Sequence, residues 1–322
     1  MKEIEALIAI SQKYGADDRF VIAGGGNTSF KTADRLWVKA SGHALATITE
    51  DGFAVLDRAL LNPMGEKKYS AETAEREDQV KNDLAAACIT RGRRPSVETS
   101  LHNCLEAAYI VHLHPTLVGG LMCSKDARER CAQLFPDALY IPYTDPGYTL
   151  FKKVYDQVAA YKKEHGAEPQ VIFLQNHGIF VGADSTEEVE KIYDCVLSTL
   201  EREVRPVPAG EAPVCDCVSE TIPAIRTILS RGGRGLKTLQ VTNNALIDSF
   251  VASRAAAAAV LSPFTPDGIV YCKSEYIYLD APCDKLVAQA EKKIEDYIAK
   301  RGHTPQVLLI KGVGLVAVGD NA

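Results

Sequence analysis

The stretch Tyr109-Ile-Val-His-Leu-His114 joins a strand pattern to two histidines. Tyrosine, isoleucine and valine favour strands, and alternate side chains of a strand point to the same face. His112 and His114 are therefore expected on one face, where two imidazoles can bind a single metal ion. Because such a pair is more often a coincidence of a surface or core strand, its meaning depends on the rest of the chain.

Segments with strand and helix patterns alternate on both sides of this stretch. The spacing of apolar residues predicts a helix after Pro115, a helix ending at Arg91, and helices at 3–14, 97–108, 147–165, 186–204, 219–230 and 284–301. Short apolar runs predict strands at 20–23, 35–39, 170–174, 178–182, 237–241, 306–310 and 314–318. Helices and strands mixed at this spacing indicate a layered α/β fold.

The composition is that of a folded protein of two domains. The chain has 322 residues, 46% of them hydrophobic and 24% charged, and 36 Lys+Arg against 42 Asp+Glu leave a net charge of −6. At about 150 residues per domain, this length predicts two domains. The acidic balance disfavours nucleic acid as a partner, whereas a local pocket of backbone amides can still bind an anionic small molecule.

The termini, the apolar runs and the cysteines predict a cytoplasmic protein without membrane contact. Glu3 and Glu5 lie where an export signal would be cationic. The longest apolar run, 255–261, is far shorter than the roughly 20 residues of a membrane helix. Nine scattered cysteines, an odd number, favour reduced thiols, and the close pair Cys215 and Cys217 has no second pair at zinc-site spacing.

Prolines and an internal repeat divide the chain unequally. The segment Arg205–Pro213 holds three prolines and a glycine, which places a domain boundary there. A shift of 136 residues aligns 140–178 with 276–314 without a gap and gives ten identities in 39 positions. The prediction is a larger domain at 1–205 and a smaller α/β domain at 218–322 that is a degenerate repeat of it. A coincidence of two similar α/β units is the alternative.

The histidines do not recur in the second half. The 136-residue shift places Val313 opposite His177, and a shift of 130 places 241–244 opposite 111–114, again without histidine. The smaller domain is therefore expected to keep the fold and to lack metal ligands.

A third histidine and a glutamate complete the candidate chemistry. His177 lies in Asn176-His-Gly178, at a turn between two predicted strands where glycine permits a close approach. With His112 and His114 it makes the three-histidine set of a catalytic zinc site that keeps an open position. Glu98, at the start of a predicted helix, is a candidate general acid/base, although a first-turn glutamate also suits the helix dipole.

A glycine loop and three serines form a candidate phosphate cradle. Gly24-Gly-Gly-Asn-Thr-Ser29 lacks the dinucleotide fingerprint, which needs GxGxxG opening a helix. Its amides, with the hydroxyls of Ser29, Ser41 and Ser96, could hold a phosphate, although a tight turn also explains the glycines. Ser96 is in addition a candidate cap of the helix that follows it. Lys39 could add charge or be an ordinary solvated lysine.

Taken in order, these motifs resemble the class II aldolase/adducin family, which includes L-fuculose-phosphate aldolase and L-ribulose-5-phosphate 4-epimerase. The motifs are Gly26-Asn-Thr-Ser29, Lys39-Ala-Ser-Gly42, Pro95-Ser-Val-Glu98, His112-Leu-His-Pro115 and Asn176-His-Gly178. The resemblance covers about residues 1–204. The stretch Leu36–Gly42 and the repeat look most like the aldolase part of bifunctional rhamnulose-1-phosphate aldolase/alcohol dehydrogenases. The dehydrogenase part is not expected here, because the chain stops after the repeat.

The resemblance implies a layered α/β/α domain that binds one Zn²⁺ per subunit and a sugar phosphate, in a homo-oligomer that is usually a tetramer. His112, His114 and His177 match the zinc ligands. Glu98 matches the acid/base of the aldolases and favours carbon–carbon cleavage, because the epimerases carry aspartate there. The positions that match the phosphate site are Gly26, Asn27, Ser41, Gly42 and Ser96.

Two features depart from the family pattern. Val97 stands where fuculose-phosphate aldolase has a second serine on the phosphate, which puts the phosphate in doubt. The tyrosine that a neighbouring subunit contributes as proton donor has no clear match, and Tyr143 and Tyr148 are the candidates.

The expected function is a zinc-dependent aldolase acting on a ketose phosphate through an enediolate, with Glu98 moving the proton. The alternatives are a sugar-phosphate 4-epimerase, a decarboxylase of a keto-sugar-acid phosphate, and a non-enzymatic interaction module like the adducin head. The three retained histidines argue against the module, since it has no need of metal ligands.

Overall fold

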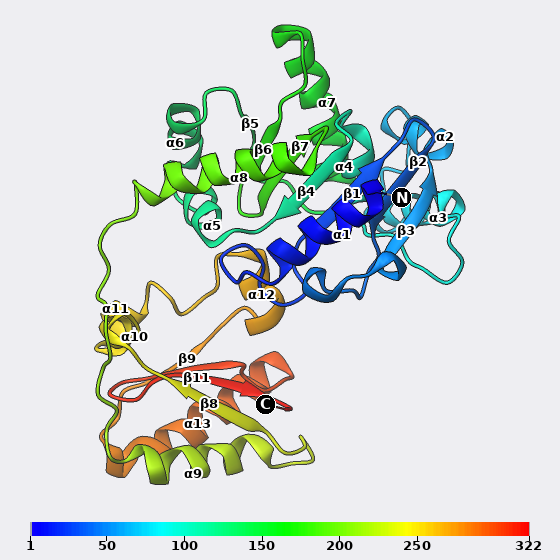
Figure 1. Ribbon diagram of the computed structural model, residues 1–322. Helices are drawn as coiled ribbons and strands as arrows, with labels where there is room; N and C mark the ends of the chain where they lie inside the picture. The colour runs from blue at the N-terminus through cyan, green and yellow to red at the C-terminus, as the bar shows by residue number, and fades with distance from the viewer. Residues whose placement is uncertain (1, 322) are drawn as a thin grey trace. The chain divides into compact units, whose positions relative to one another are not determined.

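The computed structural model describes residues 2–321 and divides the chain into two compact units (Figure 1). The first unit is Met1–Val204 and the second is Arg205–Ala322. Each unit has its own sheet and its own hydrophobic core. Along 2–321, none of the helices combines the length and apolar character needed to cross a membrane.

The first unit is built on a seven-stranded sheet of order β3-β2-β1-β4-β7-β6-β5. Every neighbouring pair is antiparallel except β5 and β6, which are parallel. The strands are β1 Asn27–Lys31, β2 Arg35–Lys39, β3 Phe53–Asp57, β4 Tyr109–Leu113, β5 Leu139–Ile141, β6 Val171–Leu174 and β7 Gly178–Ala183.

Helices cover both faces of this sheet and make three layers. Consecutive strand residues such as Ile110 and Val111, or Ile179 and Phe180, enter opposite cores, as strand alternation requires. One face packs against α1 Lys2–Gly15, α5 Thr116–Met122, α6 Ala127–Leu134 and α8 Thr186–Glu201. The other packs against α2 Arg58–Leu61, α3 Thr73–Ala87, α4 Thr99–Cys104 and α7 Tyr148–His165. The unit is therefore a layered α/β/α domain.

Most predicted elements of this unit are present, and three need correction. The helix predicted to end at Arg91 ends at Ala87, because Cys88 already has an extended backbone. No strand forms at 20–23, because Phe20 and Val21 fold back in a turn on Asp17 while their side chains remain buried. The helix predicted at 97–108 is limited to Thr99–Cys104, since the chain must extend again before β4.

The second unit has a four-stranded sheet of order β8-β11-β10-β9. Its strands are β8 Thr238–Thr242, β9 Ile277–Leu279, β10 Val307–Ile310 and β11 Gly314–Gly319, and its helices are α9 Val218–Ser230, α10 Ala245–Val251, α11 Arg254–Ala257, α12 Pro266–Cys272 and α13 Cys283–Arg301. α9 and α13 cover one face of the sheet, and α10 and α11 contribute to the smaller core on the other.

The small sheet repeats part of the large one. The order and directions of its strands match those of β4-β7-β6-β5. In each unit one helix connects the two parallel strands and ends at a left-handed glycine: α7 ends at Gly166, and α13 ends at Gly302. The residue pairs between β10 and β11 are those between β6 and β7 with 136 added to each residue number. The second unit is thus a smaller, degenerate α/β repeat, and along residues 205–321 its sheet has no counterparts of β1, β2 and β3.

Strand pairing changes two of the alignments expected from the sequence. Ile141 pairs with Leu174, and Leu279 pairs with Ile310, the residue that matches Leu174. Ile141 therefore matches Leu279 rather than Ile277, and the shift at this strand is 138. The ungapped alignment fails there because the shift changes from 138 at this strand to 136 at β6, so the second unit has two residues fewer between the two matched strands.

The histidine strand also shifts by one residue. His112 on β4 pairs with Phe180 on β7, and the residue of β11 that matches Phe180 is Val316. Val316 pairs with Val241 on β8, so Val241 is the counterpart of His112, at a shift of 129 rather than 130. The counterpart of His114 is then Asn243. The second unit has no histidine at any of the three matching positions.

Candidate active site and metal centre

The candidate site lies at one edge of the large sheet, where β1 begins, β4 ends and β7 begins. Because β4 is antiparallel to both neighbours, these three ends meet. Asn27 is directly opposite His112 in the ladder, and Leu113 is opposite Ile179. The sheet therefore brings together residues that are up to about 150 positions apart in the chain.

Three histidine side chains converge at this edge. The ligand nitrogens of His112, His114 and His177 all lie within 4.8 Å of one another, and Nε2 of His112 is 3.1 Å from Nε2 of His114. His112 is completely buried, and its ring stacks on Phe180 at 4.0 Å between centroids. The structure thus brings together the three histidines singled out in the sequence.

The His112 tautomer follows from its backbone contact. Nδ1 of His112 lies 2.9 Å from the carbonyl oxygen of Ile179, which can only accept, so Nδ1 donates. In the neutral ring, Nε2 then carries the lone pair and directs it toward His114 and Glu98. This contact orients the ring for metal binding, and Ile179 and Phe180 are supporting residues that the sequence motifs did not reveal.

The turn that presents His177 depends on close backbone packing. Asn176 has a left-handed backbone, with φ of 56°, and Gly178 follows at the start of β7. A Cβ atom on Gly178 would be 2.5 Å from the Leu113 carbonyl oxygen and 2.6 Å from Cδ2 of His114. Glycine is required here because any side chain would collide with the strand that carries the other two histidines.

Glu98 faces two of the three histidines. Its Oε1 is 3.3 Å from Nε2 of His112 and 3.4 Å from Nε2 of His177, while Asn27 Nδ2 lies 3.4 Å from Oε2. Burial raises the pKa of Glu98, but His112 and His177 outweigh it and hold that pKa well below its usual range. Glu98 is therefore a partly buried carboxylate next to the ligand nitrogens.

Ser96 organises the segment before α4 rather than capping that helix with its side chain. The residue at the cap position is Glu98, which makes no side-chain cap bond. The Ser96 hydroxyl instead accepts from the Glu98 amide at 3.2 Å and from Asn27 Nδ2 at 2.5 Å. These bonds tie the start of β1 to the loop that carries Glu98.

Four of the five residues matched to the phosphate site lie on connected loops. The Ser41 amide donates to the Arg94 carbonyl, and its hydroxyl lies 3.4 Å from the Pro95 carbonyl, which ties the segment after β2 to the Ser96 loop. Gly26, with φ of 75°, leads directly into Asn27, and a Cβ on it would meet the His112 carbonyl at 3.2 Å. Gly42 follows Ser41, has φ of 90° and is exposed.

Ser29 lies inside the protein rather than on this surface. It is completely buried, and its hydroxyl is 2.8 Å from Nδ1 of His102. His102 is also fully buried, and burial lowers its pKa to about 3, so the ring is neutral at physiological pH. The Ser29–His102 pair supports the sheet beneath the site, and the hydroxyl of Ser29 is closed off from a ligand.

The remaining sequence candidates have other surroundings. Lys39 is buried on β2, and burial lowers its pKa while Glu98 opposes the change, which places the ammonium group in the field of the site. Tyr143 is exposed and donates to Asp145, and Tyr148 donates to the Lys67 carbonyl. Val97 is 72% exposed beside Ser96 and Glu98, so it presents an apolar surface there.

The donor set fits a transition-metal ion. Nε2 of His112 lies 3.1 Å from Nε2 of His114 and 3.3 Å from Oε1 of Glu98, so neutral imidazoles and a carboxylate at these positions could share a positive ion. Imidazole nitrogens suit zinc and its neighbours in the first transition row, and three of them leave a position for substrate or water. The site can therefore hold a divalent metal through His112, His114 and His177.

The match to a family model agrees with this fold. Residues 5–201 match the model of the Class II Aldolase and Adducin N-terminal domain. This is more than half of the chain and includes all seven strands of the large sheet. The protein belongs to the class II aldolase and adducin family, as its motifs predicted.

Individual relatives extend the comparison. The N-terminal class II aldolase domain of a conserved protein from Thermoplasma acidophilum is 26% identical with a TM-score of 0.55, over 63% of this chain and 94% of that one. L-fuculose-1-phosphate aldolase from Thermus thermophilus is 14% identical with a TM-score of 0.41, over 63% of this chain and 95% of that one.

One curated relative is similar to both units. "Uncharacterized oxidoreductase YuxG" of Bacillus subtilis is 23% identical over 366 aligned positions, which cover 99% of this chain. The chain spans about half, 51%, of the length of that relative.

Proposed function

We propose that the unit Met1–Val204 is a zinc-dependent aldolase that cleaves a carbon–carbon bond of a ketose phosphate. The observation that carries this proposal is the convergence of three histidine nitrogens with one carboxylate oxygen 3.3–3.4 Å from two of them. Family membership supports an enzyme that acts on sugars, and the histidine set supports one metal ion per subunit.

His112, His114 and His177 would hold the ion. A divalent ion bound there supplies Lewis-acid stabilisation for the negative charge that develops on the substrate. The Ile179 carbonyl fixes the His112 ring, and Phe180 stacks on it, so the ligand geometry is set before substrate binds.

Glu98 is the group that moves the proton. Its carboxylate is next to the ligand nitrogens, where it can reach a carbon adjacent to the substrate carbonyl. The side chain of Asn27 faces the second oxygen of Glu98, and the Ser96 hydroxyl accepts from the Glu98 amide, so both contacts hold the carboxylate in position.

A phosphate at a distance from the reacting carbons would bind to uncharged groups. Gly26, Ser41, Gly42 and Ser96, on loops that the hydrogen bonds above connect, and Asn27 at the start of β1 would supply uncharged polar groups. Binding energy gained there fixes the substrate relative to Glu98. Val97 supplies no hydroxyl, so a non-phosphorylated ketose is the variation to include in a substrate screen.

Product analysis tests the reaction class. Metal-loaded protein is incubated with a panel of ketose phosphates and free ketoses, and products are identified by mass spectrometry. We expect a ketone fragment and an aldehyde, with at least about 10²-fold less product from His112→Ala. Isomerised sugar identifies an epimerase and carbon dioxide a decarboxylase. Metal-loaded protein that transforms no member of the panel, as expected of an adducin-like module, contradicts the proposal.

Location and assembly belong to the same proposal. We propose a cytoplasmic homo-oligomer, with a tetramer suggested by the family resemblance, and a second unit that keeps the fold but not the histidine ligands. Light scattering on the purified chain measures the oligomeric state, and a monomer at assay concentration contradicts this part.

A further inference from the structure

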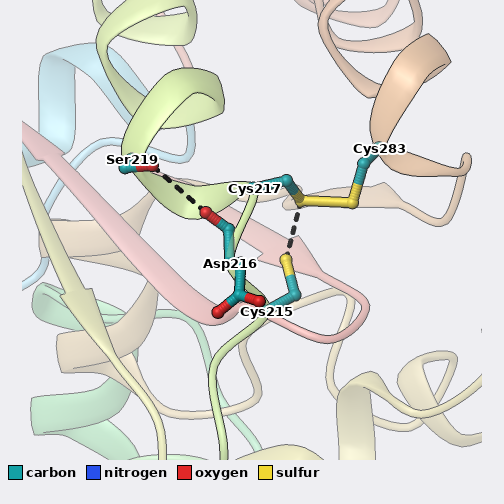
Figure 2. The surroundings of a disulfide bond; sticks show 5 residues. All are labelled: Cys215, Asp216, Cys217, Ser219 and Cys283. Atoms are coloured by element: carbon teal, nitrogen blue, oxygen red, sulfur yellow. Dashed lines mark hydrogen bonds between the residues drawn. A yellow bond between two sulfur atoms is a disulfide. The ribbon is translucent and has the colours of Figure 1, made fainter.

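Three cysteine sulfurs converge in the second unit, far along the chain from the histidine site. Cys215, Cys217 and Cys283 have all their sulfur atoms within 4.8 Å of one another (Figure 2). Cys217 and Cys283 form a disulfide across 66 residues, and Sγ of Cys215 is 2.7 Å from Sγ of Cys217. A disulfide needs two sulfurs, so the third requires an explanation of its own.

Backbone hydrogen bonds fix the loop that carries two of these cysteines. The Cys215 amide donates to the Gly312 carbonyl at 2.8 Å, and the Thr221 amide donates to the Cys217 carbonyl at 2.9 Å. The Ser219 hydroxyl donates to the Asp216 carbonyl at 3.1 Å (Figure 2). The convergence of the sulfurs is therefore built into the start of α9.

The cluster lies at the corner of the repeat that corresponds to the histidine site. Cys217 is the N-terminal cap residue of α9, which precedes β8. In the first unit the corresponding cap residue is Glu98, at the start of α4, which precedes β4. Gly312, which Cys215 contacts, matches Asn176 in the turn that presents His177. The second unit thus carries sulfur at the corner where the first unit carries its acid/base and a metal ligand.

Two of the three cysteines lie at helix starts. Cys217 caps α9, which has 13 residues, and Cys283 is the first residue of α13, which has 19. Helix N-termini carry partial positive charge and free amides, and both stabilise a thiolate. Thiolates, rather than thiols, bind metals, and Cys283 is exposed enough to admit an ion from solvent.

We propose that, when the disulfide is reduced, Cys215, Cys217 and Cys283 bind one thiophilic metal ion such as Zn²⁺, with a fourth position left for water or another ligand. A phosphine reductant breaks the sulfur–sulfur bond, takes one oxygen from water and leaves two thiols. Metal binding then displaces the thiol protons. Three sulfurs from two helix starts are a donor set that soft and borderline ions select.

Cobalt(II) is the probe, because thiolate coordination gives it a charge-transfer absorption that imidazole coordination lacks. The 322-residue chain is reduced anaerobically, freed of reductant and titrated with Co²⁺, and the band is then displaced with Zn²⁺. We expect one equivalent of the thiolate-bound form in the wild type. The band should survive in His112→Ala, which disables the histidine site, and in Cys195→Ser, which changes an exposed thiol elsewhere.

Cys215→Ser separates metal binding from a purely structural disulfide. This variant keeps the Cys217–Cys283 pair and so keeps the fold if that bond is all that matters. Metal binding predicts at least a tenfold loss of Co²⁺ affinity at the sulfur site and an unchanged thermal transition of the oxidised protein. A reduced wild type without the charge-transfer band, or a Cys215→Ser variant that binds Co²⁺ as tightly as the wild type, overturns the proposal.

Discussion

Lys31 is a cation enclosed by the first unit. It lies on β1 with 4% of its surface exposed, and its Nζ donates to the Ala107 carbonyl at 2.6 Å. Burial, aided by the positive charge of Arg58, lowers the pKa of Lys31 to about 7. The folded protein therefore releases this proton near neutral pH, whereas the unfolded chain holds it to about pH 10.

This difference predicts a pH dependence of stability. Between about pH 7 and 10 the unfolded chain binds more protons than the folded one, so stability rises with pH, by about 2 kcal/mol from pH 7 to 9. Lys31→Met removes this rise. Urea denaturation at pH 7 and pH 9 measures the change in the free energy of unfolding. Lys68→Met, at an exposed lysine, is the control and should keep the increase with pH. An equal increase in the free energy of unfolding from pH 7 to 9 in the wild type and in Lys31→Met contradicts a lowered pKa of Lys31.

At the scale of elements, the turn between β6 and β7 joins the fold to the site. Gly178 lets β7 approach β4 closely enough for His177 to meet His112 and His114. The repeat keeps the same contact without histidines, since a Cβ on Gly314 would be 2.5 Å from the Thr242 carbonyl oxygen. The glycine thus serves strand packing in both units, and in the first unit the same close approach lets the three histidines converge.

Gly178→Ala should therefore cost both stability and metal affinity. A Cβ at 2.5–2.6 Å must push the strands apart, at about 1–3 kcal/mol. Gly120→Ala is the matched control, because Gly120 lies on α5 with open space around it and should be neutral or slightly stabilising. Thermal unfolding and metal titration of both variants measure the effects. A Gly178→Ala variant as stable as Gly120→Ala contradicts the packing argument.

Local patterns predicted the long elements and the histidines that converge at the site, because each leaves a signal within a few residues. α1, α7, α13 and β4 show their periodicity directly, and the His112-Leu-His114 spacing places two of the three histidines on one strand end. The pattern could not reveal strands of three residues such as β5, which are too short to show alternation. It also could not predict the Ser29–His102 pair, since that contact spans 73 positions and exists only after the sheet and α4 pack.

At the scale of the whole molecule, the two units meet in sequence at an exposed segment. Residues 202–213 contain no helix or strand, and nearly all of them are exposed. Prolines prevent α8 from continuing through it. The first unit holds the family match and the histidine site, and the second holds a copy of half that fold with the cysteine cluster.

Limited proteolysis checks this division. A protease of broad specificity should cut first within 202–213, because cleavage needs a segment that can be extended without unfolding a core. Mass spectrometry of early fragments locates the cut. First cuts inside either sheet would contradict the division into two compact units.

The central claim is that Glu98 and the three histidines perform a metal-dependent carbon–carbon cleavage. The most direct test is the rate of aldehyde release from a cleaved ketose by wild type and Glu98→Gln, with equal bound metal at the histidine site. Glutamine keeps the size of the side chain but cannot take the proton, so the rate should fall by about 10²–10⁴-fold. An unchanged rate in Glu98→Gln with metal bound contradicts the account.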